Sequence, residues 1–178
     1  TEINVRDMDP RRYGSWACGD YAVAKSIDEY QLMYQPYLPG EFREAGRPTR
    51  NTPLYGMFKD QGAIYGDTFG WERAKWFAPQ GVAEQYGFRR SNWFATVGEE
   101  CCAVREKVGL MDLSSFAKYE ITGPHSKALL DRLCANRIPE TNGKIVLTQM
   151  LTHLGGIECE ATVARLNAEH YYVLSGAV

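Results

Sequence analysis

Apolar residues recur at helical spacing near the start of the chain. Val23, Ile27, Tyr30 and Tyr34 are separated by four, three and four positions, so their side chains fall on one stripe of an α-helix. Proline and glycine follow this stripe, and both residue types end helices. The pattern therefore predicts a helix over residues 20–34.

A second helical pattern covers residues 96–110. Thr96 and Glu99 have the spacing of a capping box, in which each side chain satisfies a free backbone N–H of the first turn. Gly109 is a suitable stop signal. The expected apolar stripe consists of Val97, Cys101, Val104 and Val108.

The last third of the chain alternates between apolar and polar residues, as half-buried strands do. Pro124 is suited to open one intervening helix, 124–135, with Leu129, Leu130 and Leu133 buried. The strands are expected over residues 116–123, 144–151, 156–166 and 170–176. A short helix at 53–61 and a strand at 63–66 precede them. The order of elements predicts an α+β fold with a largely antiparallel sheet.

Residues 40–53, "GEFREAGRPTRNTP", interrupt these patterns. They are polar and rich in glycine, proline and arginine, which is typical of a connector. This stretch is the best boundary in the chain, and it separates residues 1–50 from residues 51–178.

Composition narrows the class of protein. The 178 residues carry 20 basic and 22 acidic side chains, for a net charge of −2, and no basic run indicates nucleic-acid binding. The start of the chain lacks the apolar middle of a signal peptide. The five cysteines include the adjacent Cys101 and Cys102, and this odd, irregular set favours a reducing intracellular compartment.

Several chemistries have no motif in the sequence. There is no G-x-G-x-x-G fingerprint, no P-loop, no G-x-S-x-G and no cysteine–histidine cluster with zinc spacing. The three histidines, His125, His153 and His170, are scattered, and surface or hydrogen-bonding roles are expected for them.

The predicted hairpin at 156–176 carries the most suggestive polar residues. Alternation places Glu158, Glu160 and Thr162 on one face of the strand. If the turn pairs Leu166 with His170, Tyr172 falls opposite Ala164, on that same face. Two hypotheses fit this face: a solvent-facing polar surface, or carboxylates and a phenol that share a ligand site.

The stretch "FGWERAKWFA", residues 69–78, is dense in aromatic side chains and too irregular to predict as a strand or a helix. Its aromatic residues, together with Trp93 and Phe94, either pack a domain junction or form one wall of a pocket for a flat heteroaromatic ligand. An ion pair between Arg73 and Glu72 over a tryptophan face is a further expectation.

Longer motifs resemble a known family. The stretch "GRPTRNTPLYGMFKDQGAIYGDTFGWERAKWFAP" is similar to the segment that joins the flavin and folate domains of dimethylglycine and sarcosine dehydrogenases. Three more stretches resemble the start of their C-terminal folate domain, which is shared with the aminomethyltransferase (T-protein) of glycine cleavage: "VREKVGLMDLSSFAKYEITGP", "LTHLGGIECEATVARL" and "YYVLSGA".

The resemblance implies a fragment that spans a domain junction. Residues 1–50 would be the end of an FAD-dependent oxidoreductase domain with its connector, and residues 51–178 an incomplete T-protein-like folate-binding domain. The aromatic residues of the stretch 69–78 would pack the entry to that domain. The whole enzyme would oxidise an N-methyl amine to an iminium and transfer the one-carbon unit to tetrahydrofolate, with FAD bound upstream. The fragment alone is expected to be inactive.

The resemblance also implies site residues. Glu160 occupies the position of a carboxylate that assists folate-dependent transfer, Tyr172 matches a tyrosine of the folate site, and Leu147 and Phe116 fall where apolar residues line the pterin pocket. No metal ligand is implied. The family usually has aspartate where Glu160 stands, and the longer side chain shifts the carboxyl group by about 1.5 Å. A shift of this size can cost on the order of 100-fold in rate.

Two alternatives come from other classes of protein. One is a regulatory paralogue, such as the regulatory subunit of pyruvate dehydrogenase phosphatase. The other is a stand-alone aminomethyltransferase, although such enzymes begin near "TPLY" at residue 52. The expected location is the bacterial cytoplasm or the mitochondrial matrix, with folate, a small-molecule amine and an electron-transfer flavoprotein as partners, and without nucleic acid or membrane.

Overall fold

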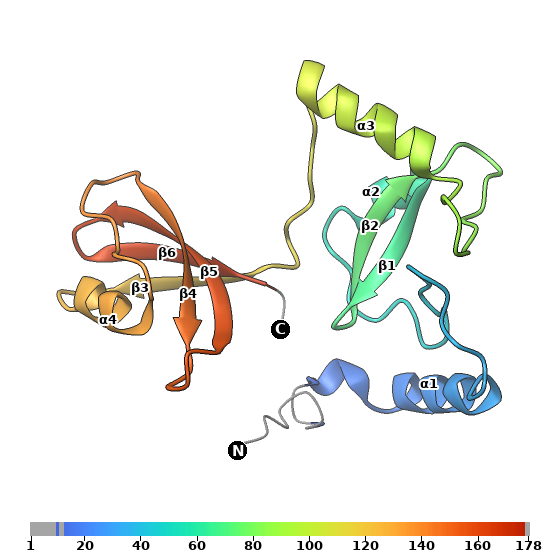
Figure 1. Ribbon diagram of the computed structural model, residues 1–178, viewed down its shortest axis with the longest axis horizontal. Coiled ribbons are helices and arrows are strands. Elements are labelled where there is room, and N and C mark those ends of the chain that lie inside the picture. The colour runs from blue at the N-terminus through green and yellow to red at the C-terminus, as the bar shows by residue number, and fades with distance from the viewer. Residues whose placement is uncertain (1–9, 11–12, 177–178) are drawn as a thin grey trace. The chain divides into compact units, whose positions relative to one another are not determined.

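The computed structural model describes residue 10 and residues 13–176, which form two compact units that divide between Ser115 and Phe116 (Figure 1). The first unit contains η3 (Ser15–Ala17), α1 (Asp20–Gln31), α2 (Tyr55–Asp60), β1 (Ala63–Thr68), β2 (Trp71–Phe77) and α3 (Phe94–Glu106). The second contains β3 (Ala117–Thr122), α4 (Ser126–Leu133), β4 (Ile145–Leu151), β5 (Ile157–Asn167) and β6 (His170–Ser175). None of the helices in the described residues has the length and apolar character needed to cross a membrane.

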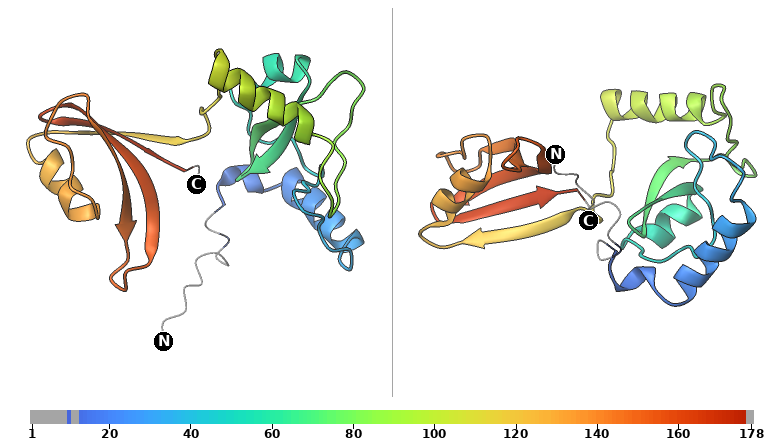
Figure 2. Two further views of the ribbon diagram at one scale, coloured as in Figure 1. Left: turned by 45° about the horizontal axis from the view of Figure 1, so that its top comes forward. Right: turned by 60° about the horizontal axis from the view of Figure 1, so that its bottom comes forward.

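The second unit is a four-stranded sheet with one helix. The strand order is β3-β6-β5-β4 and every pair is antiparallel. α4 packs against one face of this sheet (Figure 2). The core between them consists of Leu130, Cys134, Ile138, Ala161, Val163, Tyr171 and Val173. The predicted α+β class and antiparallel sheet are confirmed.

The predicted helix of this unit is shorter than expected. α4 begins at Ser126, two residues after Pro124. Leu130 is fully buried, but Leu129 and Leu133 are 47% and 45% exposed. The expectation that all three leucines are buried was wrong, because a two-turn helix presents only a narrow stripe to a sheet.

The turn between β5 and β6 also differs from the expectation. Asn167 pairs with His170, and a bulge leaves Leu166 without a register partner. The extra residue restores the expected register further along the strands, so Ala164 lies opposite Tyr172 as predicted.

The first unit is built on the β1–β2 hairpin. The short helix and the strand predicted for this region are confirmed as α2 and β1. Residues 71–77, which seemed too irregular for a strand, form β2 and pair with β1. Trp76 is buried at 2% exposure, and the Phe77 ring packs edge-to-face on Phe58, with centroids 5.3 Å apart. Much of this aromatic density is therefore the small core of one hairpin and its helix.

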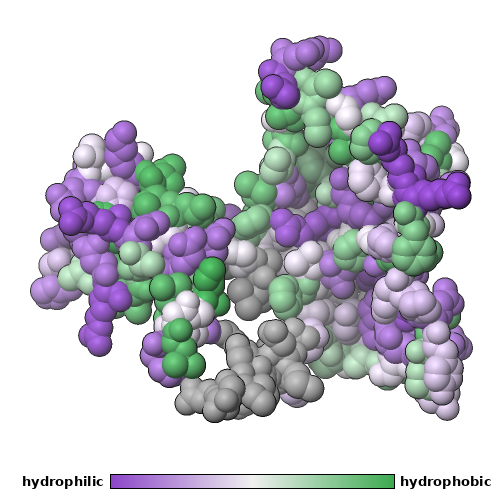
Figure 3. Space-filling model, in the orientation of Figure 1, coloured by the Kyte–Doolittle hydropathy of each residue, from purple (hydrophilic) through white to green (hydrophobic). Residues whose placement is uncertain are grey.

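Both long helices of the first unit leave their apolar stripes exposed. α1 ends three residues before the predicted position, and Val23 and Ile27 are 59% and 53% exposed. α3 begins at Phe94, so Thr96 lies inside the first turn and the predicted capping box is wrong. Apolar side chains gather where α3 leads into the segment before β3 (Figure 3), and these include Val104, Val108, Leu110 and Met111.

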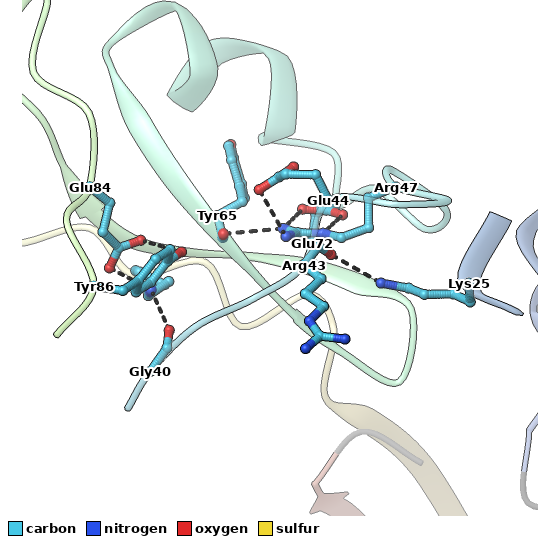
Figure 4. Close-up of polar contacts among 10 residues, drawn as sticks. Lys25, Gly40, Arg43, Glu44, Arg47, Tyr65, Glu72, Glu84 and Tyr86 are labelled. Atoms are coloured by element: carbon cyan, nitrogen blue, oxygen red, sulfur yellow. Dashed lines mark hydrogen bonds and ion pairs between the residues drawn. The ribbon is translucent and has the colours of Figure 1, made fainter. Parts of the chain in front are cut away.

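A buried ion pair fixes the connector to the hairpin. Arg47 donates from Nε and Nη2 to both carboxylate oxygens of Glu72, at 2.9 and 2.7 Å, and also from Nη2 to the carbonyl of Tyr65, at 3.1 Å (Figure 4). The side chains of Arg47 and Glu72 are only 4% and 3% exposed. The sequence had suggested Arg73 as the partner of Glu72, but neighbours on a strand point to opposite faces.

The cation over a tryptophan also comes from the connector. The guanidinium of Arg50 lies 4.1 Å from the ring centroid of Trp71. Residues 40–53 are thus packed into the first unit, and the compact units divide at Ser115 instead. The predicted boundary between the flavin-domain segment and the folate-domain segment, between residues 50 and 51, concerns protein families and not compact units. It stays a prediction.

A substitution in this unit tests the electrostatics of the hairpin. Burial raises the pKa of Asp67, against the opposing effects of the Gly70 N–H and Arg47. A carboxyl group with a raised pKa binds its proton more tightly in the folded state, so its charge destabilises the fold at neutral pH and the cost disappears as the pH falls toward 4. We expect Asp67→Asn to raise the melting temperature at pH 7.5, by an amount that shrinks on acidification.

Tryptophan fluorescence is a suitable readout, because all four tryptophans precede Ser115. A lower melting temperature in Asp67→Asn, or a difference in melting temperature from the wild type that does not change with pH, would contradict the claim that the charge of Asp67 destabilises the fold.

Candidate functional site

The candidate residues lie on the face of the second unit's sheet opposite α4. Side chains alternate along a strand, so positions that pair with one another share a face. Because Ala161, Val163, Tyr171 and Val173 point into the core, the intervening residues point the other way. We call this surface the open face, and it comprises Lys118, Glu120, Thr122, Ile145, Leu147, Gln149, Glu160, Thr162, Ala164, His170, Tyr172 and Leu174.

Three of the four predicted site residues share this face. Leu147 pairs with Thr162, Glu160 with Gln149, and Tyr172 with Ala164. Phe116 precedes β3 by one residue and is half-buried, outside the sheet itself. The structure therefore brings Glu160, Leu147 and Tyr172 onto one surface, and their roles remain predictions.

Glu160 and Tyr172 stand at opposite ends of the open face. Tyr172 is level with Ala164, which is four residues from Glu160 along β5. At about 3.3 Å per residue, these two levels are about 13 Å apart. The row between them consists of Leu147, Thr162, Leu174 and Lys118. The face thus offers a carboxylate, a middle row with two leucines and a phenol along the strand direction, which suits an elongated ligand.

The carboxylate of Glu160 is exposed. Its closest side-chain partner is the amide of Gln149, whose Nε2 lies 3.5 Å from Oε2, at the limit of a hydrogen bond. Nothing in the described residues covers this carboxylate, so its two oxygens remain accessible as acceptors for a ligand N–H.

Sequence reasoning missed a polar pair beside Tyr172. Glu120 on β3 is directly opposite Tyr172, and its Oε2 lies 3.4 Å from Nε2 of His170. The separation of fifty positions gives no sequence signal, because only the β3–β6 pairing brings the two residues together. At the Tyr172 end, the open face therefore carries a phenol, a carboxylate and an imidazole.

A hollow elsewhere in this unit has balanced charges. A shallow hollow of about 290 Å³ lies at the end of α4, lined in part by Lys127, Asp131 and Glu140. Lys127 Nζ lies 2.6 Å from Asp131 and 3.5 Å from Glu140, and its hydrogen bond lowers the pKa of Asp131. With Arg137, which also lines the hollow, the charged side chains are two positive and two negative. Among the described residues, no group of three or more metal-ligating side chains is close enough to hold an ion.

Comparisons with known proteins agree with this architecture. Residues 54–178 match the family model of the GCVT N-terminal domain, and residues 1–52 match the FAD dependent oxidoreductase central domain. The first match covers most of the chain, so the protein belongs to the GCVT N-terminal domain family.

Several curated relatives match nearly the whole chain, among them a dehydrogenase and a regulatory subunit. The mitochondrial dimethylglycine dehydrogenase of Rattus norvegicus is 39% identical over 178 residues, which cover 98% of this chain and 20% of that protein. The mitochondrial pyruvate dehydrogenase phosphatase regulatory subunit of Mus musculus is 32% identical over 182 residues, covering 97% of this chain and 20% of that protein. The chain thus spans a fifth of the length of these relatives. The predicted resemblance to dimethylglycine dehydrogenases is confirmed.

A solved structure supports the fold. The glycine cleavage system aminomethyltransferase T from Bartonella henselae aligns with a TM-score of 0.58 at 19% identity, covering 72% of this chain and 31% of that one. At this identity the comparison concerns the fold alone, and it confirms the predicted T-protein-like architecture.

A substitution on the core face of the sheet tests how the second unit is stabilised. The hydroxyl of Tyr171 is buried and has no hydrogen-bond partner, in a residue with 0% exposure. A buried polar group without a partner costs about 1–3 kcal/mol. We expect Tyr171→Phe to stabilise the second unit by about 1 kcal/mol, measured as slower amide exchange in β5 and β6.

The matched control is Tyr172→Phe on the open face, where the hydroxyl is not enclosed in the core, and no such gain is expected. Faster exchange in Tyr171→Phe would show that its hydroxyl is satisfied in the folded protein.

Proposed function

We propose that the chain is part of a flavin-dependent dehydrogenase that oxidatively demethylates an N-methyl amine of the dimethylglycine or sarcosine type. The one-carbon unit then passes to tetrahydrofolate. The observation that carries this proposal is the adjacent match of an FAD oxidoreductase module and a GCVT module in one chain. The 39% identity to a dimethylglycine dehydrogenase across both modules supports it.

The proposed division of labour follows the two modules. Residues 1–50 would end the flavin domain with its connector, and residues 51–178 would begin the folate domain. The chain has no dinucleotide fingerprint, so FAD is assigned to another part of the polypeptide. An electron-transfer flavoprotein as electron acceptor, and a mitochondrial matrix or bacterial cytoplasmic location, belong to the same proposal. The name of the rat relative places that protein in mitochondria.

The open face fits the chemistry of a reduced folate. When bound, tetrahydrofolate would supply the nucleophilic amine that takes up the iminium carbon, and the demethylated amine would leave carrying a proton. Glu160 would accept a hydrogen bond from the folate amine and hold the proton that the amine releases. Leu147 in the middle of the face, and Tyr172 at its far end, would contact the flat rings of the ligand. Phe116 would add apolar surface next to the start of β3.

The test uses the full-length protein with dimethylglycine and tetrahydrofolate. The wild type is expected to convert the released one-carbon unit into methylene-tetrahydrofolate. In Glu160→Gln the amine is still oxidised at the wild-type rate, but the yield of methylene-tetrahydrofolate drops by on the order of 100-fold and formaldehyde appears instead. The measurement is the ratio of the two products at equal turnover.

A matched substitution separates charge from reach. Glu160→Asp keeps the carboxylate and restores the residue type usual in the family, so it is expected to retain or increase folate transfer. Unchanged product ratios in both variants would remove Glu160 from the site, and loss of amine oxidation in both would contradict its assignment to the folate step.

A second candidate function is regulatory. The observation that favours it is the 32% identity to a phosphatase regulatory subunit over 97% of the chain. A regulatory paralogue would keep its biological activity in Glu160→Ala, whereas the enzyme would lose folate coupling. A stand-alone aminomethyltransferase is a weaker candidate, because residues 1–52 match a flavin-oxidase module.

A further inference from the structure

The segment that carries α1 is tied to the β1–β2 hairpin by residues 43–52, which we call the strap. Its backbone joins the hairpin as a partial third strand. Arg50 N–H donates to the Gly70 carbonyl at 2.9 Å, and Glu72 N–H donates to the Arg50 carbonyl at 2.9 Å. An isolated bridge pairs Arg50 with Trp71 in parallel orientation. The polar stretch that composition marks as a connector is thus held along the strand.

The strap also binds α1. The Lys25 ammonium donates to the Arg43 carbonyl at 3.0 Å, and Arg43 Nη1 lies 3.3 Å from Glu29. The Arg43 guanidinium stacks over Tyr37, 3.8 Å from the ring centroid, and its side chain is 5% exposed. Arg43 therefore joins the strap to α1 and to the segment that follows it.

A direct contact joins η3 to the turn between β1 and β2. A Cβ atom built on Gly70 would lie 2.4 Å from the ring of Trp16 in η3. The tryptophan therefore packs against the backbone of the β1–β2 turn, where only glycine fits. Gly70 has φ +77°, which also favours glycine.

Among the described residues, the Arg47–Glu72 pair is the one contact of the strap in which two full charges are buried together. Removing one partner of such a pair leaves the other charge buried without compensation, and this is far more costly than loss of an exposed pair. Arg47 also has an exposed partner, Glu44, at 3.3 Å, whose side chain is 84% exposed.

We infer that the strap fuses the end of the flavin-oxidase-matched segment and the start of the GCVT-matched segment into one folding unit. α1 and the β1–β2 hairpin then unfold together, and the Arg47–Glu72 pair controls this cooperativity. The physical boundary of the first unit lies after α3, not in the arginine-rich connector. This inference does not depend on the proposed function.

Limited trypsin digestion of the 178-residue chain tests the inference, with fragments identified by mass. Trypsin does not cut the Arg47–Pro48 bond, so Arg43 and Arg50 report on the strap. In the wild type we expect cleavage after the exposed Lys107 while the bonds after Arg43 and Arg50 stay intact. In Glu72→Gln we expect cleavage after Arg43 and Arg50 to become at least about tenfold faster, because proteolysis follows the population of the open state.

Glu44→Gln is the matched control, because it also removes a carboxylate partner of Arg47, but at an exposed position. It should leave cleavage after Arg50 at the wild-type rate. The bond after Arg43 is left out of this comparison, because residue 44 forms that bond and an acidic residue there slows trypsin. Equal cleavage rates in Glu72→Gln and Glu44→Gln would overturn the role of the buried pair. Wild-type cleavage after Arg43 or Arg50 as fast as after Lys107 would overturn the strap itself.

Hydrogen exchange on the unaltered chain keeps the inference testable if Glu72→Gln fails to fold. Amides of α1 and of β1–β2 are expected to share one opening free energy. Exchange of α1 amides that is more than about tenfold faster than that of the hairpin would refute a single folding unit.

Discussion

The register of β5 between β4 and β6 is the constraint on which the candidate site depends. Side chains on a strand alternate with a period of two, so a slip by one residue would send Glu160 into the core and Ala161 out to the open face. Ala161 and Val163 are 2% and 0% exposed, and their burial under α4 fixes the register. The bulge at Leu166 absorbs the extra residue of the turn without disturbing this arrangement. The core face of the sheet thus positions the polar groups of the other face.

The first unit depends on a different kind of interaction. Its hairpin and short helix enclose little apolar surface, with Trp76 and Phe58 as the main buried aromatics. The Arg47–Glu72 pair and the cation stacks of Arg43 and Arg50 add directional contacts to this small core. Buried charge pairs require defined geometry. Polar composition in residues 40–53 therefore reflects a network of specific contacts and not a solvated linker.

Local patterns predicted the strands of the second unit well, because alternation is a property of neighbouring residues. The register of Tyr172 with Ala164 followed from the same reasoning. Contacts between distant residues were beyond that reach: Glu72 finds Arg47 25 positions away, and Glu120 meets His170 only through strand pairing.

Periodicity also says that a helix has an apolar stripe without saying what covers it. The helices α1 and α3 were expected, but the exposure of their apolar stripes could not be predicted from periodicity. The capping box at Thr96 failed because the helix begins two residues earlier, and helix ends are the least certain part of a periodic pattern. Alternation correctly predicted that Glu160 and Tyr172 share one face of the sheet, while the roles of these residues came from family resemblance and stay predictions.

We propose that this chain is part of a flavin-dependent dehydrogenase that acts on an N-methyl amine. The most direct measurement is the visible absorption spectrum of the full-length protein, recorded without oxygen before and after addition of dimethylglycine or sarcosine. We expect flavin bands that bleach when one of these amines is added. A full-length protein without flavin bands, prepared with FAD present, would contradict it.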